Sequence, residues 1–255
     1  MSCVAEKIHS DLAALGIKSS DTVLMHASFK SLGSIEGGAK TFFEALLSYF
    51  GDEGTLIMPA LSFVSVTAKN PNFNLKETPS CIGYLPEYFR TQVSGVKRSL
   101  HATHSCCAVG KYADEIVANH HLDETPVGKN SPFAKLPGLN GKILFVGCSS
   151  NHNTSVHDIE ELCEPPYLFN REKKITYTLD DGEGKVYTRE SIRHYFLKED
   201  GTHYDQQYSR LEGLLADSEI RRGKILMADC TVMDAVAVWE KGVLAIKNNP
   251  YFFVV

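Results

Sequence analysis

The sequence predicts a three-layer α/β/α protein, in which helices cover both faces of a mixed, largely parallel sheet. Two observations support this fold class. Short apolar segments alternate with amphipathic ones along most of the chain, and the 255 residues contain no internal repeat, low-complexity tract or long flexible linker. Because a chain of this length can fold as one α/β unit, we expect residues 1–255 to form a single domain.

The first quarter of the chain predicts a βαβ unit. Apolar residues recur at helical spacing over residues 4–15, and residues 22–26 have the composition of a short buried strand. A loop rich in Ser and Gly covers 27–38, a second amphipathic helix is expected over 42–50, and a second strand over 55–58. Two strands joined through a helix in this way pair in parallel.

The rest of the chain repeats this alternation less regularly. The clearest prediction is a β-hairpin, because residues 174–179 and 185–190 flank the turn sequence Asp-Asp-Gly-Glu-Gly. A long loop is expected over 62–80. The patterns also predict helices over 84–90, 112–119, 154–163, 206–215 and 234–239, and strands over 142–147 and near 225–227.

Charge and composition argue against several kinds of partner. The 26 basic and 31 acidic residues give a net charge of −5 with His neutral, whereas nucleic-acid binding requires a basic surface. No apolar run approaches the ~20 residues that cross a bilayer. We therefore expect neither a nucleic acid nor a membrane as partner. The sequence is compatible with a homodimer.

Cysteine usage indicates the compartment. The seven cysteines are scattered without CxxC pairs, which favours reduced thiols over a disulfide framework. The opening residues, Met1 to Lys7, lack the apolar stretch of a signal peptide. Both features predict a cytoplasmic location.

Three segments carry candidate chemistry, and the first runs from His26 to Gly38. A strand end followed by a loop of small residues and a helix can bind phosphate through backbone N–H groups and the helix N-terminus. The P-loop and GxGxxG patterns are absent. From the residues alone, the segment is either an ordinary βα turn or a phosphate or cofactor cradle.

The second segment runs from Lys97 to Ser105. Arg98 and Ser99 could hold a phosphate by charge-assisted hydrogen bonds. His101 and His104 could share a metal if the segment were helical, but a metal site needs three or four converging ligands. Because no HxxxH or HExxH motif supplies the others, we predict no metal site, and a solvated polar loop is the alternative.

The third segment, Asn153 to Glu160, follows the strand predicted over 142–147. On a helix, Thr154, His157 and Glu160 would share one face, because they are spaced by three. A histidine beside a carboxylate is suited to general-base work near neutral pH. The alternative is the start of a surface helix, with Thr154 near the N-cap and Glu160 solvated.

These segments together resemble the aminoglycoside 3-N-acetyltransferase family (antibiotic N-acetyltransferases). The resemblance runs from His26 to about Val243, and the order and spacing of its parts are more specific than any one part. Those parts are His26-x-Ser28, Ser31-Leu32-Gly33-x-x-x-Gly37-Gly38, Gly54-Thr55-Leu56-x-Met58-Pro59, Thr78-Pro79-Ser80-x-x-Gly83-x-Leu85-x-Glu87-x-Phe89-Arg90, Arg98-Ser99-x-His101-x-x-x-Ser105, Pro126-x-Gly128-x-x-Ser131-Pro132, Gly147 and Thr154-x-x-His157-x-x-Glu160.

The resemblance implies transfer of an acetyl group from acetyl-CoA, as co-substrate, to an amine, in the family's own α/β/α fold rather than the GNAT fold. It implies that His157 is the general base, that Glu160 orients it, and that Thr154 lies close to the thioester. The residues it implies for CoA binding are His26, Ser28, Ser31, Leu32, Gly33, Ile35, Gly37, Gly38, Arg98, Ser99 and Ser105.

Two departures from the family pattern bear on the acceptor. Ala102 stands where members often have Pro, and residues 70–76 carry no carboxylate. An amino sugar or another amine is therefore favoured over a polycationic drug, although Asp158, Glu161 and Glu164 could attract a cation. Two alternatives stay open: an acyl hydrolase with a Cys or Ser nucleophile, for which Cys106, Cys107 and Cys163 are candidates, and a non-catalytic CoA-binding protein.

Overall fold

The computed structural model describes residues 3–255, so Met1 and Ser2 of the N-terminal segment lie outside the described residues. Within that range the chain forms a seven-stranded sheet and a separate three-stranded sheet. None of the helices in residues 3–255 combines the length and the apolar character that crossing a membrane requires.

The large sheet has the strand order β4-β5-β2-β1-β6-β10-β9. Its centre is parallel, because β1 (Thr22–Ala27) pairs in parallel with both β2 (Thr55–Pro59) and β6 (Lys142–Val146). The antiparallel pairings place only β5 and β10 against the common direction. The remaining strands are β4 (Lys97–Arg98), β5 (Cys106–Gly110), β9 (Ile220–Ile225) and β10 (Ala228–Asp234). The expected mixed, largely parallel sheet is confirmed.

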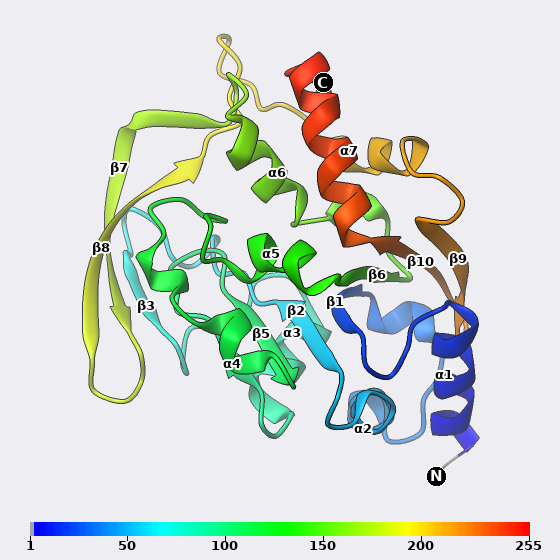
Figure 1. Cartoon of the computed structure of the whole chain (residues 1–255). Helices are drawn as coiled ribbons and strands as arrows, with labels where there is room; N and C mark the ends of the chain where they lie inside the picture. Colours follow the sequence, from blue (N-terminus) through cyan, green and yellow to red (C-terminus); the bar gives the residue numbers. More distant parts are fainter. Residues whose placement is uncertain (1–2) are drawn as a thin grey trace.

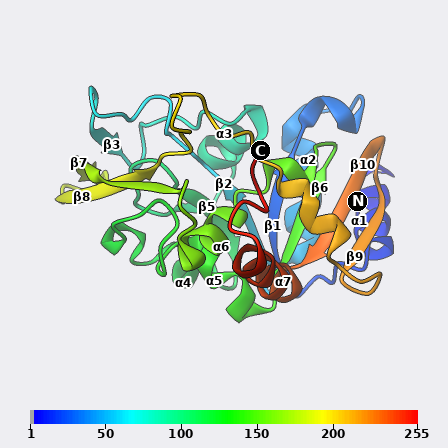
Figure 2. The same cartoon turned by 90° about the horizontal axis from the view of Figure 1, so that it is seen from above.

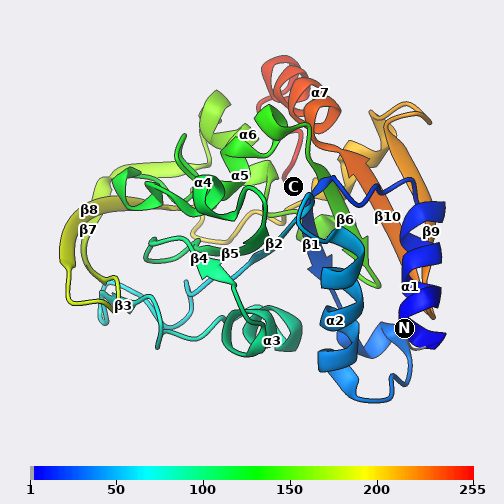
Figure 3. The same ribbon diagram turned by 60° about the horizontal axis from the view of Figure 1, so that its bottom comes forward.

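Helices cover both faces of this sheet, which confirms the three layers (Figure 3). One face carries α1 (Cys3–Ala14), α2 (Gly38–Phe50) and α3 (Tyr84–Gln92). The other carries α4 (Ala113–Val117), α5 (Pro132–Lys135), α6 (Val156–Cys163) and α7 (Ala235–Asn248). Short 3₁₀ helices are η1 (Phe29–Leu32), η2 (His120–Leu122), η3 (Pro137–Leu139), η4 (Ser150–His152) and η5 (Tyr208–Gly213).

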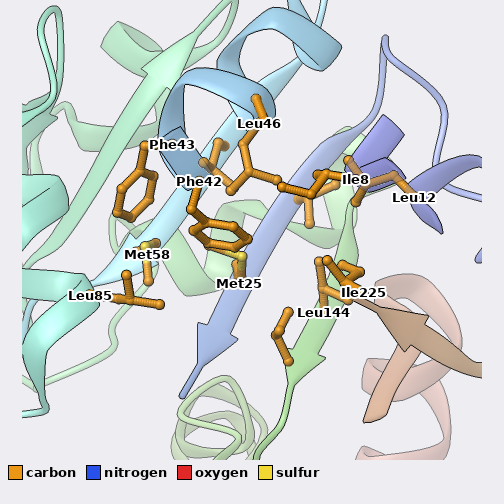
Figure 4. Close-up of a cluster of buried hydrophobic side chains, with 14 of the residues drawn as sticks. Ile8, Leu12, Met25, Phe42, Phe43, Leu46, Met58, Leu85, Leu144 and Ile225 are labelled. Atoms are coloured by element: carbon orange, nitrogen blue, oxygen red, sulfur yellow. The ribbon is translucent and has the colours of Figure 1, made fainter. Parts of the chain in front are cut away.

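Alternation along the central strands builds both cores. In β1, Val23 and Met25 face α1 and α2, whereas Leu24 packs with the α6 and α7 layer. Figure 4 shows the first of these clusters, where Phe42 and Leu46 of α2 lie over Met25. Because successive strand side chains point to opposite faces, an apolar run such as residues 22–26 is buried on both sides.

The second sheet consists of β3 (Asn72–Asn74), β7 (Phe169–Asp180) and β8 (Val186–His194), and it lies at the opposite end of the molecule from β9 and α1 (Figures 1 and 2). The β7–β8 pair confirms the predicted hairpin. The hairpin packs on the loops that precede β5, through Tyr177 and Leu179 against Leu100. The end of β8 thereby brings His194 next to α6.

Some elements differ from the sequence prediction. The third helix of the C-terminal half begins at Val156, two residues later than expected, and 206–215 forms the 3₁₀ helix η5 instead of an α-helix. Residues 226–227 form the turn between β9 and β10, not a strand, and β4 and β5 were not predicted. The final helix runs on to Asn248, beyond the predicted 239.

Candidate active site

A cavity of about 600 Å³ opens where the parallel strands end. His26 and Ala27 close β1, Pro59 closes β2, and Cys148 follows β6. We call it the histidine cavity; its lining is Met25, His26, Ala27, Pro59, Leu61, Phe63, Ile82, Pro86, His104, Cys148, Asn151, His152, Thr154, His157, Arg193, His194, Phe196, Gln206 and Tyr208. A crevice at the carboxyl ends of strands is the usual ligand position in open α/β sheets.

His157 and Glu160 form a hydrogen-bonded pair on α6. Nδ1 of His157 lies 3.0 Å from Oε2 of Glu160, and the glutamate side chain is fully buried behind the imidazole. The hydroxyl of Tyr208 lies 3.0 Å from the same Nδ1 and donates to Oε2 of Glu160 over 2.9 Å. Tyr167 donates to the other oxygen, Oε1, over 2.7 Å. The carboxylate is thus held by three partners.

This network determines which nitrogen of His157 faces the cavity as a base. The Glu160 carboxylate accepts, and Tyr208 has already directed its own proton to Glu160, so both partners of Nδ1 are acceptors toward it. Nδ1 therefore carries the proton and Nε2 keeps its lone pair. The imidazole of His157 lines the cavity, so this lone pair is available to a ligand there.

Thr154 lies in the turn that leads into α6, not in the helix as expected. Its carbonyl accepts from the backbone N–H of His157 over 3.2 Å, and Asn153 Oδ1 accepts from the N–H of Ser155. Asn153 thereby stabilises the turn and delays the helix, because Asn side chains compete for nearby backbone N–H groups. Thr154 is almost buried and still lines the cavity beside His157.

His26 lies against the floor of the cavity. Its ring stacks on Phe145 with centroids 5.2 Å apart, and its Nε2 is buried with no hydrogen-bond partner among residues 3–255. Burial, reinforced by the nearby His152, lowers the pKa of His26 to about 3. The side chain is thus a neutral imidazole whose unused nitrogen can take a ligand hydrogen bond.

The loop after β1 divides the other predicted residues between two roles. Leu32 and Ile35 are part of the apolar core, and the carbonyl of Ser28 accepts from Ser31 Oγ over 2.6 Å. None of Ser28, Ser31, Leu32, Gly33, Ile35, Gly37 and Gly38 lines the histidine cavity, although Ser31 lines a neighbouring hollow. The loop therefore lies beside the cavity.

The neighbouring hollow, of about 760 Å³, lies over β9 and β10 and meets the histidine cavity at Cys148. Arg222 and Lys224 line it, paired with Glu212 at 2.7 Å and Asp229 at 2.8 Å. We call it the basic hollow. Two connected compartments, one basic and one rich in histidine, fit an elongated ligand with an anionic end.

Gly147 allows the loops after β1 and β6 to approach each other. Its φ is +60°, and a Cβ there would lie 1.6 Å from Oγ of Ser31. Gly33, also with positive φ, brings the same loop against Met227, where a Cβ would lie 2.9 Å from Cγ. Only glycine combines this backbone with such contacts.

Arg98, Ser99 and Ser105 use their polar atoms inside the protein. The Arg98 guanidinium donates to Ser105 Oγ and to the carbonyls of Ala60, Leu75 and Thr78. Ser99 Oγ is bonded to His120 Nδ1, 2.9 Å away, and Ser105 Oγ donates to Ala60. None of the three lines the cavity, so these contacts indicate a role in positioning the loops around it.

Several cavity residues escaped the sequence analysis: Phe63, His104 as a cavity residue, Arg193, His194, Phe196 and Tyr208. His104 was considered only with His101 on a helix, but the segment is a turn in which Nδ1 of His101 accepts from two backbone N–H groups. His194 and Tyr208 come from distant parts of the chain, and no local pattern connects them with His157.

The thiols do not resemble activated nucleophiles. Burial raises the pKa of Cys107 to about 12 and that of Cys148, the one thiol in the cavity lining, to about 11. Burial also raises the pKa values of Cys106 and Cys163. A nucleophilic cysteine has a lowered pKa, so the geometry disfavours the cysteine-dependent hydrolase.

The cavity lining contains no Asp or Glu among the described residues. The three carboxylates expected to attract a cation are used elsewhere. Asp158 accepts from Trp239 Nε1, Glu161 lies under His194, and Glu164 pairs with Arg171. Burial raises the pKa of Asp158 to about 6 and that of Glu161 to about 8.

Comparisons with known proteins agree with the resemblance seen in the motifs. The family described as Aminoglycoside 3-N-acetyltransferase matches residues 24–246. The aminoglycoside N(3)-acetyltransferase VII of Streptomyces paromomycinus is 31% identical, covering 93% of this chain and 89% of the relative. The SPbeta prophage-derived aminoglycoside N(3')-acetyltransferase-like protein YokD of Bacillus subtilis is 29% identical, covering 92% and 90%.

Solved structures show the same fold. The crystal structure of the aminoglycoside acetyltransferase AAC(3)-Xa superposes with a TM-score of 0.79 at 27% identity, covering 96% of this chain and 92% of its own. A binary complex of AAC-IIIb with CoASH superposes with a TM-score of 0.79 at 25% identity, covering 96% of both chains.

Proposed function

The chain belongs to the aminoglycoside 3-N-acetyltransferase family, a family of acyltransferases, and from that premise we propose that it transfers the acetyl group of acetyl-CoA to an amine of an amino sugar or aminoglycoside-like acceptor. In this proposal residues 1–255 act as one acetyltransferase domain. The observation that carries it is the His157–Glu160 pair, whose imidazole lines a cavity at the carboxyl ends of the parallel strands.

His157 would act as the general base. An amine that is protonated at neutral pH is not nucleophilic, so Nε2 removes a proton before or during attack. A C–N bond then forms at the thioester carbonyl, the C–S bond breaks, and the thiol of CoA leaves with a proton. Glu160 stabilises the imidazolium that results, because its carboxylate lies 3.0 Å from Nδ1.

Thr154 is our candidate for stabilising the oxyanion. Its side chain lines the cavity on the turn that precedes His157. A hydroxyl donor aimed at the charge that develops in the transition state contributes a large part of the rate of acyl transfer. Most of the remaining gain comes from holding both substrates in attack geometry.

The two connected compartments support acetyl-CoA as co-substrate. Arg222 and Lys224 in the basic hollow suit the phosphates, and the passage at Cys148 leads toward His157. The close approach of Ser31 to Gly147 keeps the adjoining loops narrow at this point. The binary complex of AAC-IIIb with CoASH shows that a related protein of the same fold binds the product form of this co-substrate.

The lining favours an acceptor of low positive charge. Arg193 and several histidines face the cavity, which has no acidic side chain in the described part of the chain. A polycation would meet no compensating charge there. A mono-amino sugar, or an amine that also carries an anionic group, fits better, and solved relatives are described in complex with a gentamicin and with apramycin.

The proposal is tested with a panel of amines. Purified full-length protein is incubated with acetyl-CoA and either an aminoglycoside, a mono-amino sugar or a nucleotide-linked amino sugar, and release of free thiol is followed. We expect amine-dependent release, with the mono-amino compounds having the higher kcat/KM. Release of thiol without any amine would indicate a hydrolase. No release with any amine, despite CoA binding, would favour a non-catalytic CoA-binding protein.

A further inference from the structure

Three histidines from distant segments meet in the histidine cavity. His104 precedes β5, His157 lies on α6 and His194 ends β8. One ring nitrogen of each lies within 4.8 Å of the others. The ring centroids of His157 and His194 are 4.4 Å apart, and those of His104 lie 5.3 Å from His194 and 5.9 Å from His157. General acid–base chemistry at one imidazole does not require the other two.

We propose that His104, His157 and His194 form a binding site for a divalent transition-metal ion, zinc in the first place, and that the bound ion inhibits acetyl transfer. Zinc commonly binds three histidines and one water, at about 2.1 Å from each nitrogen. Tetrahedral ligands are then about 3.4 Å apart, so each nitrogen needs to move inward by less than about 1 Å.

The hydrogen bonds of the three rings leave the required nitrogens free. Nδ1 of His104 is 2.8 Å from Thr103 Oγ1, Nδ1 of His157 is 3.0 Å from Glu160, and Nε2 of His194 is 2.7 Å from Glu161. The opposite nitrogen of each ring forms no hydrogen bond within residues 3–255. The ligands would therefore be Nε2 of His104, Nε2 of His157 and Nδ1 of His194.

The outer partners have the chemistry of a metal site. A histidine ligand usually donates its second N–H to a carboxylate, carbonyl or water, which fixes the ring and raises its basicity. Glu160 and Glu161 provide this for His157 and His194, and the Thr103 hydroxyl provides it for His104. All three rings line the cavity, which gives the ion an entry path and room for a fourth ligand.

The consequence for catalysis follows from the shared nitrogen. Nε2 of His157 is the lone pair that the proposed reaction uses to accept a proton. A metal ion coordinated there removes the base without altering the fold. Acetyl transfer should then stop at saturating zinc and recover when a chelator removes the ion. This consequence rests on the proposed function, whereas binding itself does not.

Binding is therefore measured first, without CoA, whose thiol would compete for the metal. Full-length protein is titrated with ZnCl₂ by calorimetry and with CoCl₂ by visible spectroscopy. We expect one equivalent of each, and the intense visible bands of four-coordinate Co(II). The chain has free cysteines, so absence of a thiolate-to-cobalt charge-transfer band in the near ultraviolet separates the histidine site from thiol binding.

Variants locate the site. His104→Ala and His194→Ala should each abolish the one-equivalent binding, and Glu161→Gln should weaken it by about 10- to 100-fold, as expected for an outer partner. The control is His203→Ala, which removes an exposed imidazole outside the cavity and should bind zinc like the parent. Thermal unfolding verifies that each variant is folded.

Two results would overturn the proposal. The first is parent protein that shows no one-equivalent binding or no four-coordinate Co(II) spectrum, a result independent of whether any variant folds. The second is binding that survives in folded His194→Ala protein. Undiminished amine-dependent thiol release at saturating zinc would exclude His157 as a ligand. Loss of acetyl transfer in the metal-free parent contradicts the proposed function alone.

Discussion

Nδ1 of His157 lies 3.0 Å from Oε2 of Glu160, one helical turn further along α6. The glutamate is fully buried and has no other imidazole partner among the described residues. Its carboxylate therefore fixes the tautomer of His157 and stabilises the protonated ring that forms during proton transfer.

Glu160→Gln tests this relationship. The amide keeps the shape of the side chain but removes the charge that favours the imidazolium. We expect kcat to fall about 10- to 100-fold, a part of the roughly 10²–10⁴ that a general base contributes, with the KM for acetyl-CoA nearly unchanged. Steady-state thiol release measures both. If kcat is retained, Glu160 does not orient the base.

Tyr208→Phe removes the hydroxyl that lies 3.0 Å from Nδ1 of His157 and 2.9 Å from Oε2 of Glu160. The ring stays, so packing should be preserved. We expect kcat to fall by up to about 10-fold and its pH profile to shift, because the imidazole loses one of its two fixed partners.

Tyr167→Phe is the matched control. Tyr167 donates to Oε1 of the same carboxylate but is not hydrogen-bonded to His157. It should affect kcat and its pH profile less than Tyr208→Phe does. Equal effects of the two substitutions would mean that Tyr208 acts through Glu160 only.

Much of the site was predictable because it is local in sequence. The spacing of Thr154, His157 and Glu160 predicted the base and its carboxylate, which lie on one short segment. The alternation of apolar strands predicted the central sheet. In contrast, His194 and Tyr208 reach His157 only because the β7–β8 hairpin and η5 pack near α6, and such contacts leave no pattern in the local sequence.

The errors in the fold prediction have similar causes. The β9 strand contains Arg221, Arg222 and Lys224, whose charge conceals a strand that lies at the edge of the sheet. The apolar residues 225–227 suggested a strand, but Leu226 has a φ of +53° and lies in the turn. An edge strand exposes one side to solvent, so hydrophobic periodicity is weak there.

Gly147→Ala tests the close approach of the loops after β1 and β6. The new Cβ would lie 1.6 Å from Ser31 Oγ, and the φ of +60° is unfavourable for alanine. Backbone strain of this kind costs about 1–3 kcal/mol. We expect a lower free energy of unfolding and weaker CoA binding, measured by denaturant titration and calorimetry.

Gly138→Ala is the control for this substitution. A Cβ at Gly138 meets nothing within 4 Å. Both the free energy of unfolding and the CoA affinity should stay close to those of the parent. CoA affinity that is unchanged in folded Gly147→Ala protein would separate these loops from the CoA site.

Buried neutral imidazoles predict sensitivity to acid. Burial lowers the pKa of His26 to about 3 and that of His101 to about 4, and also lowers the pKa values of His104, His120 and His194. Below pH 6.5 the unfolded chain takes up protons that the folded chain does not, so the free energy of unfolding falls as the pH decreases. The raised pKa values of Asp158 and Glu161 oppose this trend but are fewer.

His26→Phe measures one part of this effect. Phenylalanine keeps the stack on Phe145 and removes the titratable group. Between pH 6 and 4, the slope of the free energy of unfolding against pH should decrease by about 1.4 kcal/mol per pH unit, which corresponds to one proton. Denaturant titrations across this range give the slope. A slope equal to that of the parent would mean that His26 is protonated in the folded chain.

The role of His157 is tested most directly by two measurements on one preparation of His157→Gln protein: CoA affinity by calorimetry and amine-dependent thiol release with acetyl-CoA. We predict a CoA affinity close to that of the parent and a turnover lower by about 10²–10⁴. Parent-like turnover in this variant would contradict the assignment of His157 as the base.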